Sequence, residues 1–166
     1  LRPEFNVLGS GECLGLPLPV WILALIALGA FVHLRHTHTG RGFYAVGGNE
    51  LAARASGLRV DALKTYAYTI CGTLAGLAGV VLAARVTTGQ PNAGVAYELD
   101  AIAAVVIGGT SLSGGVGGVG GTLLGALLIG ILNNGLDLLN VSSYYQQIIK
   151  GLIIIGAVWL DRRSKR

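Results

Sequence analysis

The sequence predicts an all-α membrane protein, a polytopic bundle of about five transmembrane helices with a short helix in one cytoplasmic loop. Hydrophobic residues make up 52% of the 166 positions and charged residues only 12%, a balance that soluble domains do not need. Five apolar stretches have the length and character of membrane helices, which satisfy their own backbone hydrogen bonds in lipid. We therefore expect residues 1–166 to form one transmembrane domain, with the loop at residues 40–61 inside it.

The five predicted spans cover residues 19–34, 63–84, 99–112, 122–139 and 143–160. The third is the weakest, because at 1.5 Å per residue it reaches only about 21 Å across a hydrocarbon core of about 30 Å. A re-entrant segment here would reverse the last two spans and place the basic C-terminal tail outside. We therefore favour a short span that its neighbours shield from lipid.

The lysine and arginine residues predict the orientation. If the loop at residues 40–61 is cytoplasmic, nine basic residues lie on that side of the membrane and three on the other. Because Lys and Arg are concentrated in cytoplasmic loops, the loop and the C-terminus are predicted to be cytoplasmic and the N-terminus to lie outside. The net charge of +4 then reflects topology, and no nucleic-acid partner is expected.

A short capped helix is predicted within the loop at residues 40–61. Asn49 is a suitable N-cap, and Gly57 can adopt the left-handed conformation that ends a helix. Glu50 and Arg54 are four residues apart and share one helix face. A helix of two turns is marginal alone, so it packs either on its own membrane domain or in a groove of a partner protein. Amphipathicity does not separate these two interpretations.

The glycine-rich segment at residues 108–121 contains a G-x-G-x-x-G match at Gly115, Gly117 and Gly120. No βαβ pattern surrounds the match, and no Gly-Lys-Ser or Gly-Lys-Thr ends it, so the motif does not predict nucleotide binding. Small residues four positions apart predict close approach of helix backbones instead. The glycines with such spacing are Gly72, Gly76, Gly114, Gly117, Gly118, Gly121 and Gly125.

Polar residues in or beside the predicted spans are the candidates for a translocation pathway, because burying them in lipid is costly. Glu98 and Asp100 lie at the outer mouth of the third span, where the helix dipole also favours carboxylates. Asn133 and Asn134 lie inside the fourth span and either bond a neighbouring helix or line a polar path.

One lysine lies near the outer start of the last predicted span. Lys150 either extends its ammonium group toward the membrane surface or pairs with Asp137, and we favour the pair. Amides, tyrosines and a few carboxylates facing a water path suit a neutral polyhydroxylated solute, whose hydroxyls need paired donors and acceptors.

The sequence indicates no enzyme. No nucleophile with a nearby base is present, and no pair of carboxylates is spaced for catalysis. His33, His36 and His38 cluster at the inner end of the first span, but no cysteine or carboxylate lies close to them in the sequence. We interpret them as an interfacial, partly protonated cluster. We therefore expect no catalytic residue, no metal and no directly bound cofactor.

Three segments strongly resemble the membrane permease subunit of ribose-type ABC sugar importers. They are RGFYAVGGNELAARASGL, QPNAGVAYELDAIAAVVIGGTSLSGGVGG and GALLIGILNNGLDLLNVSSYYQ. The resemblance covers nearly the whole chain and corresponds to the C-terminal half of such a permease, which agrees with the absence of methionine. It implies transport of ribose or a similar monosaccharide across the bacterial inner (plasma) membrane, with ATP used by a partner ATPase.

The resemblance also implies partners: a second permease copy, a cytoplasmic ABC ATPase, a periplasmic sugar-binding protein and membrane lipid. It favours docking of the loop helix, because in this family the loop carries an EAA-like coupling helix. Leu51 departs from the alanine that usually follows the glutamate of that motif. The residues expected to couple the permease to the ATPase are Asn49, Glu50, Ala52, Ala53, Arg54 and Gly57.

Two other functions remain open. An importer of the same architecture for a nucleoside, an autoinducer sugar or a branched-chain amino acid fits the same pattern. A passive channel subunit is the alternative from a different class. The capped loop helix argues against a passive channel, because a passive pore needs no element that couples it to an ATPase.

Overall fold

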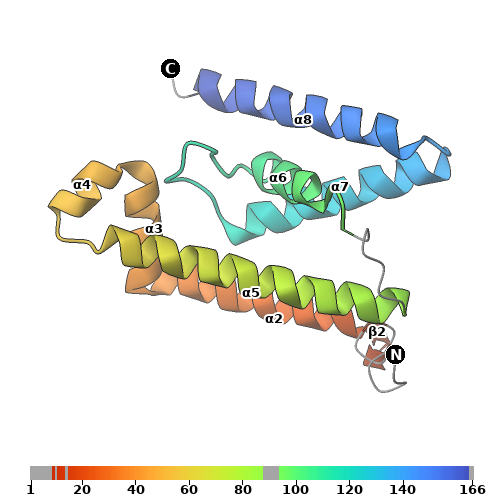
Figure 1. The fold of residues 1–166 in the computed structure, drawn as a ribbon, viewed down its shortest axis with the longest axis horizontal. Helices are drawn as coiled ribbons and strands as arrows, with labels where there is room; N and C mark the ends of the chain where they lie inside the picture. Colours follow the sequence, from red (N-terminus) through yellow and green to blue (C-terminus); the bar gives the residue numbers. More distant parts are fainter. Residues whose placement is uncertain (1–8, 10, 14, 88–93, 165–166) are drawn as a thin grey trace. The chain divides into compact units, whose positions relative to one another are not determined.

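The computed structural model describes residues 9, 11–13, 15–87 and 94–164, which are mostly helical (Figure 1). It divides into two compact units. The first unit contains Leu1–Phe43 and Ala53–Gly94, and the second contains Tyr44–Ala52 and Val95–Arg166. The prediction of one transmembrane domain over residues 1–166 stays a prediction. The last two residues of the basic tail lie outside the described residues.

Two long apolar helices dominate the first unit. A small antiparallel pair of strands, β1 (Glu12–Cys13) and β2 (Leu16–Pro17), leads directly into α2 (Leu18–His36). The other long helix is α5 (Val60–Val86). None of the residues of α2 is buried, and many of its apolar side chains are exposed on the surface of the described structure.

The helix α3 (His38–Gly48) follows α2 after a single residue and was not predicted from the sequence. Thr37 separates the two helices: its hydroxyl donates to the His33 carbonyl at 2.6 Å and accepts from the Gly40 N–H at 3.0 Å. The second bond is the N-cap bond that a threonine provides at a helix start. Gly40 is required at this turn, because a Cβ there would overlap the backbone carbonyl of His33.

An aromatic cluster joins α2, α3 and α5 at one end of the first unit. The ring of Tyr66 lies 5.7 Å from that of His33 and 6.0 Å from that of Phe43, measured between centroids. Edge and stacked arrangements at these separations are favourable. Gly42 is buried against the side chain of Leu63, where an added Cβ would lie 2.9 Å from a methyl group.

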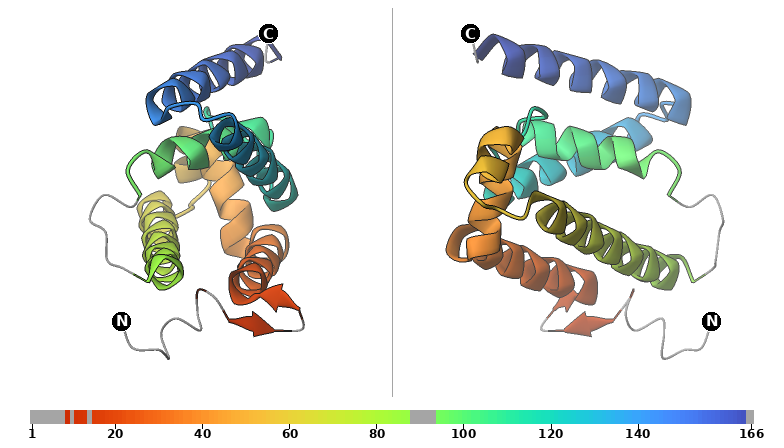
Figure 2. Two further views of the ribbon diagram at one scale, coloured as in Figure 1. Left: turned by 90° about the vertical axis from the view of Figure 1, so that its right-hand side faces the viewer. Right: turned by 60° about the vertical axis from the view of Figure 1, so that its left-hand side comes forward.

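The second unit is built from α6 (Tyr97–Ile107), α7 (Val119–Leu138) and α8 (Ser143–Ser164). Figure 2 shows α6 and α7 running antiparallel and side by side. A small core of Ala103, Ala104 and Ile129 lies between them, with Ile154 of α8 packed against it. Small residues on α6 thus allow the three helices to approach closely.

Three helices among the described residues are long and apolar enough to cross a membrane: α2, α5 and α7. They match the first, second and fourth predicted spans. The fifth predicted stretch forms α8, which begins at the predicted residue and carries Gln146, Gln147 and Lys150 in its first turns.

The third predicted span is shorter than expected. The helix α6 has 11 residues, about 16 Å of rise, and it ends at Ile107 where the prediction extended to residue 112. The helix stops because the chain turns at Gly109, whose φ of +84° is left-handed. A connection of non-helical backbone then leads to α7.

Candidate functional site

The predicted loop helix is present as α4 (Glu50–Ala55). Asn49 caps it, because its Oδ1 accepts the Ala52 N–H at 3.0 Å. Gly57 ends it with a φ of +83°, donating its N–H to the Arg54 carbonyl at 3.1 Å. Both ends of this six-residue helix are therefore held by local hydrogen bonds.

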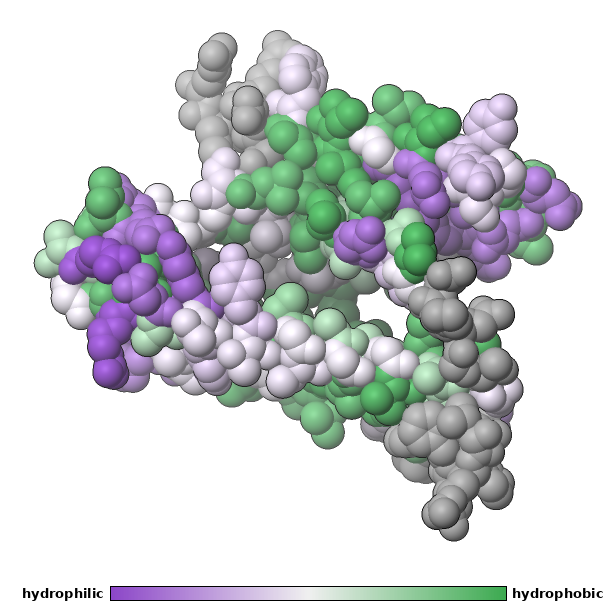
Figure 3. All heavy atoms as spheres, in the orientation of Figure 1, coloured by the Kyte–Doolittle hydropathy of each residue, from purple (hydrophilic) through white to green (hydrophobic). Residues whose placement is uncertain are grey.

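One face of α4 packs inward and the other is open to solvent. Ala53 is buried, whereas Ala52 is exposed and Leu51 is 81% exposed. Figure 3 shows hydrophilic residues gathered over α4 and the segment that follows it. A small helix that exposes a leucine side chain among hydrophilic residues is typical of a surface that binds another protein.

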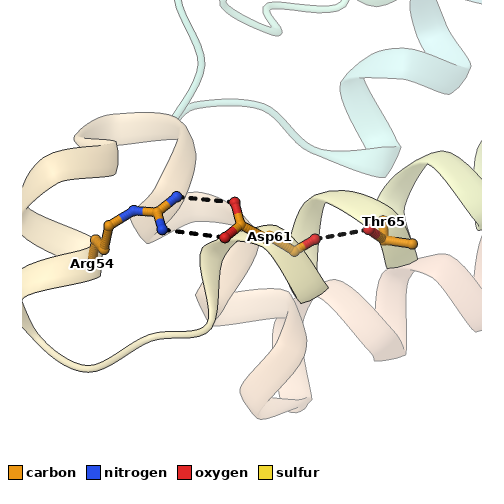
Figure 4. A network of polar contacts seen from close by, with 3 residues as sticks. All are labelled: Arg54, Asp61 and Thr65. Atoms are coloured by element: carbon orange, nitrogen blue, oxygen red, sulfur yellow. Dashed lines mark hydrogen bonds and ion pairs between the residues drawn. The ribbon is translucent and has the colours of Figure 1, made fainter.

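Arg54 forms a two-bond ion pair with Asp61 across the turn that follows α4 (Figure 4). Its Nη2 lies 2.9 Å from Asp61 Oδ1, and its Nη1 lies 3.2 Å from Oδ2. The sequence did not predict Asp61 as the partner of Arg54, because a residue seven positions away is reached only through the turn at Gly57. Both side chains are well exposed, so the pair orients Arg54 more than it stabilises the fold.

A buried polar network joins the three helices of the second unit. Lys150 Nζ on α8 lies 2.6 Å from Oδ1 of Asp100 on α6. Asn133 on α7 donates from Nδ2 to Oδ2 of the same carboxylate at 3.1 Å. The Lys150 side chain is only 11% exposed and that of Asp100 22%. Asp100, Asn133 and Lys150 are called the α6–α8 network below.

The predicted pairing of Lys150 with Asp137 is wrong. Asp137 Oδ1 instead accepts a hydrogen bond from Gln146 Nε2 at 2.8 Å, close to the connection between α7 and α8. Lys150 lies one helical turn further along α8 than Gln146, and at that position it reaches Asp100 on α6. Sequence spacing alone could not identify this partner, because α6 packs against α8 only in the folded unit.

The four predicted pathway residues fall into two groups. Asp100 and Asn133 belong to the α6–α8 network, where they bond each other. Glu98 and Asn134 are exposed and form no part of that network. A pathway role for any of the four stays a prediction.

The predicted packing glycines also divide. A Cβ at Gly121 would overlap the carbonyl oxygen of Gly108, and one at Gly125 would overlap that of Ala104, so both allow α7 to contact α6. Gly117 lies in the connection before α7 rather than in a helix. No atom of the described chain lies within 4 Å of a Cβ at Gly72 or Gly76, so their packing role stays a prediction.

The histidine cluster serves local contacts in the structure. His33 Nε2 lies 3.1 Å from the Thr39 hydroxyl, and His38 Nδ1 lies 2.9 Å from Arg41 Nη2. Within the described ranges, no group of three or more His, Cys, Asp or Glu side chains is placed to hold a metal ion. Cys71 is a free, exposed thiol on α5.

Comparisons with known proteins agree on one family. The chain is 54% identical over 161 residues to the ribose import permease protein of Escherichia coli K12, covering 97% of this chain and 50% of that protein. It is 52% identical over 160 residues to the ribose import permease protein of Bacillus subtilis 168, covering 96% and 50% respectively. It is 46% identical over 152 residues to the xylose transport system permease protein of E. coli K12, covering 92% and 39%.

The chain thus spans about half the length of the ribose permeases that it matches. No solved structure matches it. The model of a single protein family covers residues 4–158, nearly all of the chain. On this match, the chain belongs to the family described as the permease component of the branched-chain amino acid transport system, and it is a membrane protein.

Proposed function

We propose that this chain is part of the permease subunit of an ATP-driven ABC importer that moves ribose or a similar monosaccharide across the bacterial inner membrane. The observation that carries the proposal is the 54% identity to a ribose import permease protein over 97% of the chain. The xylose permease relative supports the monosaccharide class as a whole. The long apolar helices α2, α5 and α7 agree with a membrane-embedded path.

Such a permease performs no covalent chemistry and binds no cofactor of its own. Its task is to exchange outward-open and inward-open states, and a ligand or partner shifts those states only by binding one better than the other. ATP binding and hydrolysis in a cytoplasmic ATPase supply that bias, and a periplasmic sugar-binding protein delivers the solute. A second copy of the permease completes the pathway, and the loop and C-terminus face the cytoplasm.

The helix α4 is the proposed contact with the ATPase. Its capped ends keep it helical without a partner, and its exposed Leu51 offers an apolar contact for a groove. Arg54 is oriented by Asp61 and stays exposed on α4 together with Leu51 and Ala52, with Glu50 one turn earlier on the same face as Arg54. The coupling role assigned to Asn49, Ala53 and Gly57 is then to shape this helix rather than to touch the ATPase.

For the pathway, the structure favours different roles within the predicted set. Asp100 is held by Asn133 and Lys150 inside the α6–α8 network, so Asp100 and Asn133 support α6. Glu98 and Asn134 are exposed and are the better candidates to meet sugar hydroxyls, which need both donors and acceptors.

The test is uptake of labelled ribose and a panel of sugars by cells that carry the complete permease with its ATPase and binding protein. ATP-dependent uptake of ribose or a related monosaccharide is expected. Uptake that persists without the ATPase would indicate a passive channel. Uptake of a branched-chain amino acid or nucleoside, with no sugar transported, would overturn the proposed substrate class.

Replacing Glu50 and Arg54 together by alanine is expected to uncouple ATP hydrolysis from transport while the permease stays in the membrane. The reason is that both side chains leave the exposed helix that faces the ATPase, whereas the caps at Asn49 and Gly57 remain. Sugar uptake and ATP hydrolysis are measured in the same vesicles. The control is Asp61→Asn, which breaks the ion pair but keeps both residues, and unchanged uptake in the double variant would remove them from coupling.

A further inference from the structure

The glycine-rich connection between α6 and α7 is folded into a defined turn. Ser111 is buried, and its N–H donates to the Val116 carbonyl at 3.0 Å. The Gly114 N–H donates to the Ser111 carbonyl at 3.1 Å. Gly114 and Gly115 have φ values of +88° and +75°, a left-handed conformation that other residues rarely adopt. The backbone of this connection is therefore held in one shape.

The end of α3 lies directly against this turn, backbone to backbone. A Cβ at Gly47 would lie 2.6 Å from the Gly115 nitrogen, and one at Gly114 would lie 2.5 Å from the Gly47 carbonyl oxygen. A Cβ at Gly115 would in turn lie 2.8 Å from the Gly48 Cα. No side chain fits between Gly47 and the backbone of Gly114 and Gly115, so at these residues the contact is between peptide groups.

Tyr44 adds a second point of contact one helical turn earlier. Its hydroxyl donates to the Gly117 carbonyl oxygen at 3.0 Å, and the residue is partly buried. Tyr44 and Gly47 belong to the same compact unit as α6, α7 and α8, although they are distant from these helices in sequence. The end of α3 is thus attached to the turn at two separate places.

We propose that residues 44–48 and 114–117 form a joint that carries movement of α4 into the α6–α7 pair, with Tyr44 as its positioning residue. The inference rests on the proposed function. Only Asn49 separates α3 from α4, so a displacement of α4 by the ATPase moves the end of α3 with it. Because the contact is between backbones, no flexible side chain absorbs the movement before it reaches the turn.

The turn is flanked by a close contact between α6 and α7. Gly108 precedes it and Gly121 follows it, and these two glycines bring α6 and α7 together. A movement of the turn therefore shifts both helices at the end where Gly108 and Gly121 bring them together. The α6–α8 network holds the far end of α6 against α7 and α8, so the displacement becomes a tilt of the hairpin rather than a slide.

The test uses the complete permease with its ATPase and binding protein in vesicles, and it compares two adjacent glycines. Gly47→Ala forces the joint apart, whereas a Cβ at Gly48 meets no atom within 4 Å, so Gly48→Ala is the matched control. Sugar transported per ATP hydrolysed is expected to fall on the order of tenfold in Gly47→Ala, because the added methyl group has no room beside the Gly115 backbone and forces the two segments apart. The Gly48→Ala variant is expected to keep the wild-type ratio.

Tyr44→Phe guards against a general folding defect, because it removes only the hydroxyl that bonds Gly117. We expect it to lower the transport ratio with ATP hydrolysis and thermal stability retained. Wild-type ratios in both Gly47→Ala and Tyr44→Phe would overturn the joint. A fall of the same size in Gly48→Ala would overturn it as well, because the methyl group added at Gly48 does not reach the turn.

A readout that does not depend on the sugar separates failure of the joint from failure of the proposed function. A fluorophore is attached to Leu124→Cys, an exposed position on α7, in a background without Cys13 and Cys71. The joint predicts a fluorescence change on ATP addition that persists in Gly48→Ala and is lost in Gly47→Ala. Persistence of the change in Gly47→Ala overturns the joint whichever solute is transported, and no change in the parent overturns it too.

Discussion

Replacing Lys150 by methionine is expected to lower the free energy of unfolding of the permease by about 3–5 kcal/mol, the cost of leaving one charge of a buried pair without its partner. Lys150 Nζ lies 2.6 Å from Asp100 Oδ1, and its side chain is 11% exposed. Methionine preserves most of the packing volume of the lysine stem. The loss therefore comes from the Asp100 carboxylate, which keeps its hydrogen bond from the Asn133 amide but no longer has the lysine charge beside it.

The double variant Asp100→Asn, Lys150→Met is the decisive comparison. It removes both charges, and the new asparagine oxygen can still accept from Asn133, so the double variant is expected to be more stable than Lys150→Met alone. Replacing a buried ion pair with neutral groups is often nearly neutral for stability. Unfolding is followed by thermal or denaturant melts of the purified permease in detergent, analysed as a double-mutant cycle.

Lys64→Met controls for the general loss of a lysine, because Lys64 is exposed at the start of α5. The Lys64→Met variant is expected to have the same melting temperature as the wild type. Additive effects of the two single substitutions at Asp100 and Lys150 would show that the pair contributes no coupling. The network would then have to be interpreted as two independent side chains.

Replacing Gly125 by leucine is expected to prevent α6 from packing on α7 and to abolish a monodisperse permease on size-exclusion chromatography. Even the first carbon of the side chain would overlap the Ala104 carbonyl oxygen, which is backbone and cannot rotate away. The same holds at Gly121 against the carbonyl of Gly108. Forcing one methylene into a packed core costs about 1–3 kcal/mol, and leucine adds several that have no room.

The control for the glycine substitutions lies on the same helix. A Cβ at Gly120 or Gly130 meets no atom of the described chain within 4 Å, so alanine fits at both positions. Alanine there is expected to leave the permease intact or to stabilise it, because alanine favours a helix over glycine by about 1 kcal/mol. Equal yields of Gly125→Leu and Gly120→Ala protein would contradict a tight α6–α7 contact.

The helical framework was predictable because hydropathy and length determine where a chain can cross lipid. The predicted spans at 19–34, 63–84 and 122–139 correspond to α2, α5 and α7 within a few residues. The helix α3 was not predicted, because its sequence is rich in glycine and not apolar enough to be identified as a span. Thr37 was the one available signal, since threonine is a common N-cap residue. The early end of α6 depends on a left-handed glycine that hydropathy does not register.

In the candidate site, contacts between neighbouring residues could be predicted from the sequence, whereas contacts that depend on the tertiary fold could not. Asn49 and Gly57 act on backbone groups within three or four residues, so the caps of α4 could be predicted. The contacts of Tyr44 and Lys150 could not, because they depend on how distant segments fold together, and the pairing of Asp61 with Arg54 could not, because it depends on the path of the turn at Gly57. The pairing of Lys150 with Asp137 was wrong for this reason: nearness along the chain favoured Asp137, whereas packing of α8 on α6 selected Asp100.

The turn at residues 111–117 has one more consequence, for protein engineering. Glycine- and serine-rich stretches are ordinarily flexible linkers, and composition marks this one as a natural place to insert an affinity tag or a fluorescent protein. In this segment, glycine is needed at several positions because neighbouring backbone leaves no room for a Cβ. Hydrogen bonds within the loop also fix its shape. A two-residue insertion should therefore be far less tolerated in this segment than its composition implies. The segment has the composition of a flexible linker but the packing of a rigid structural element.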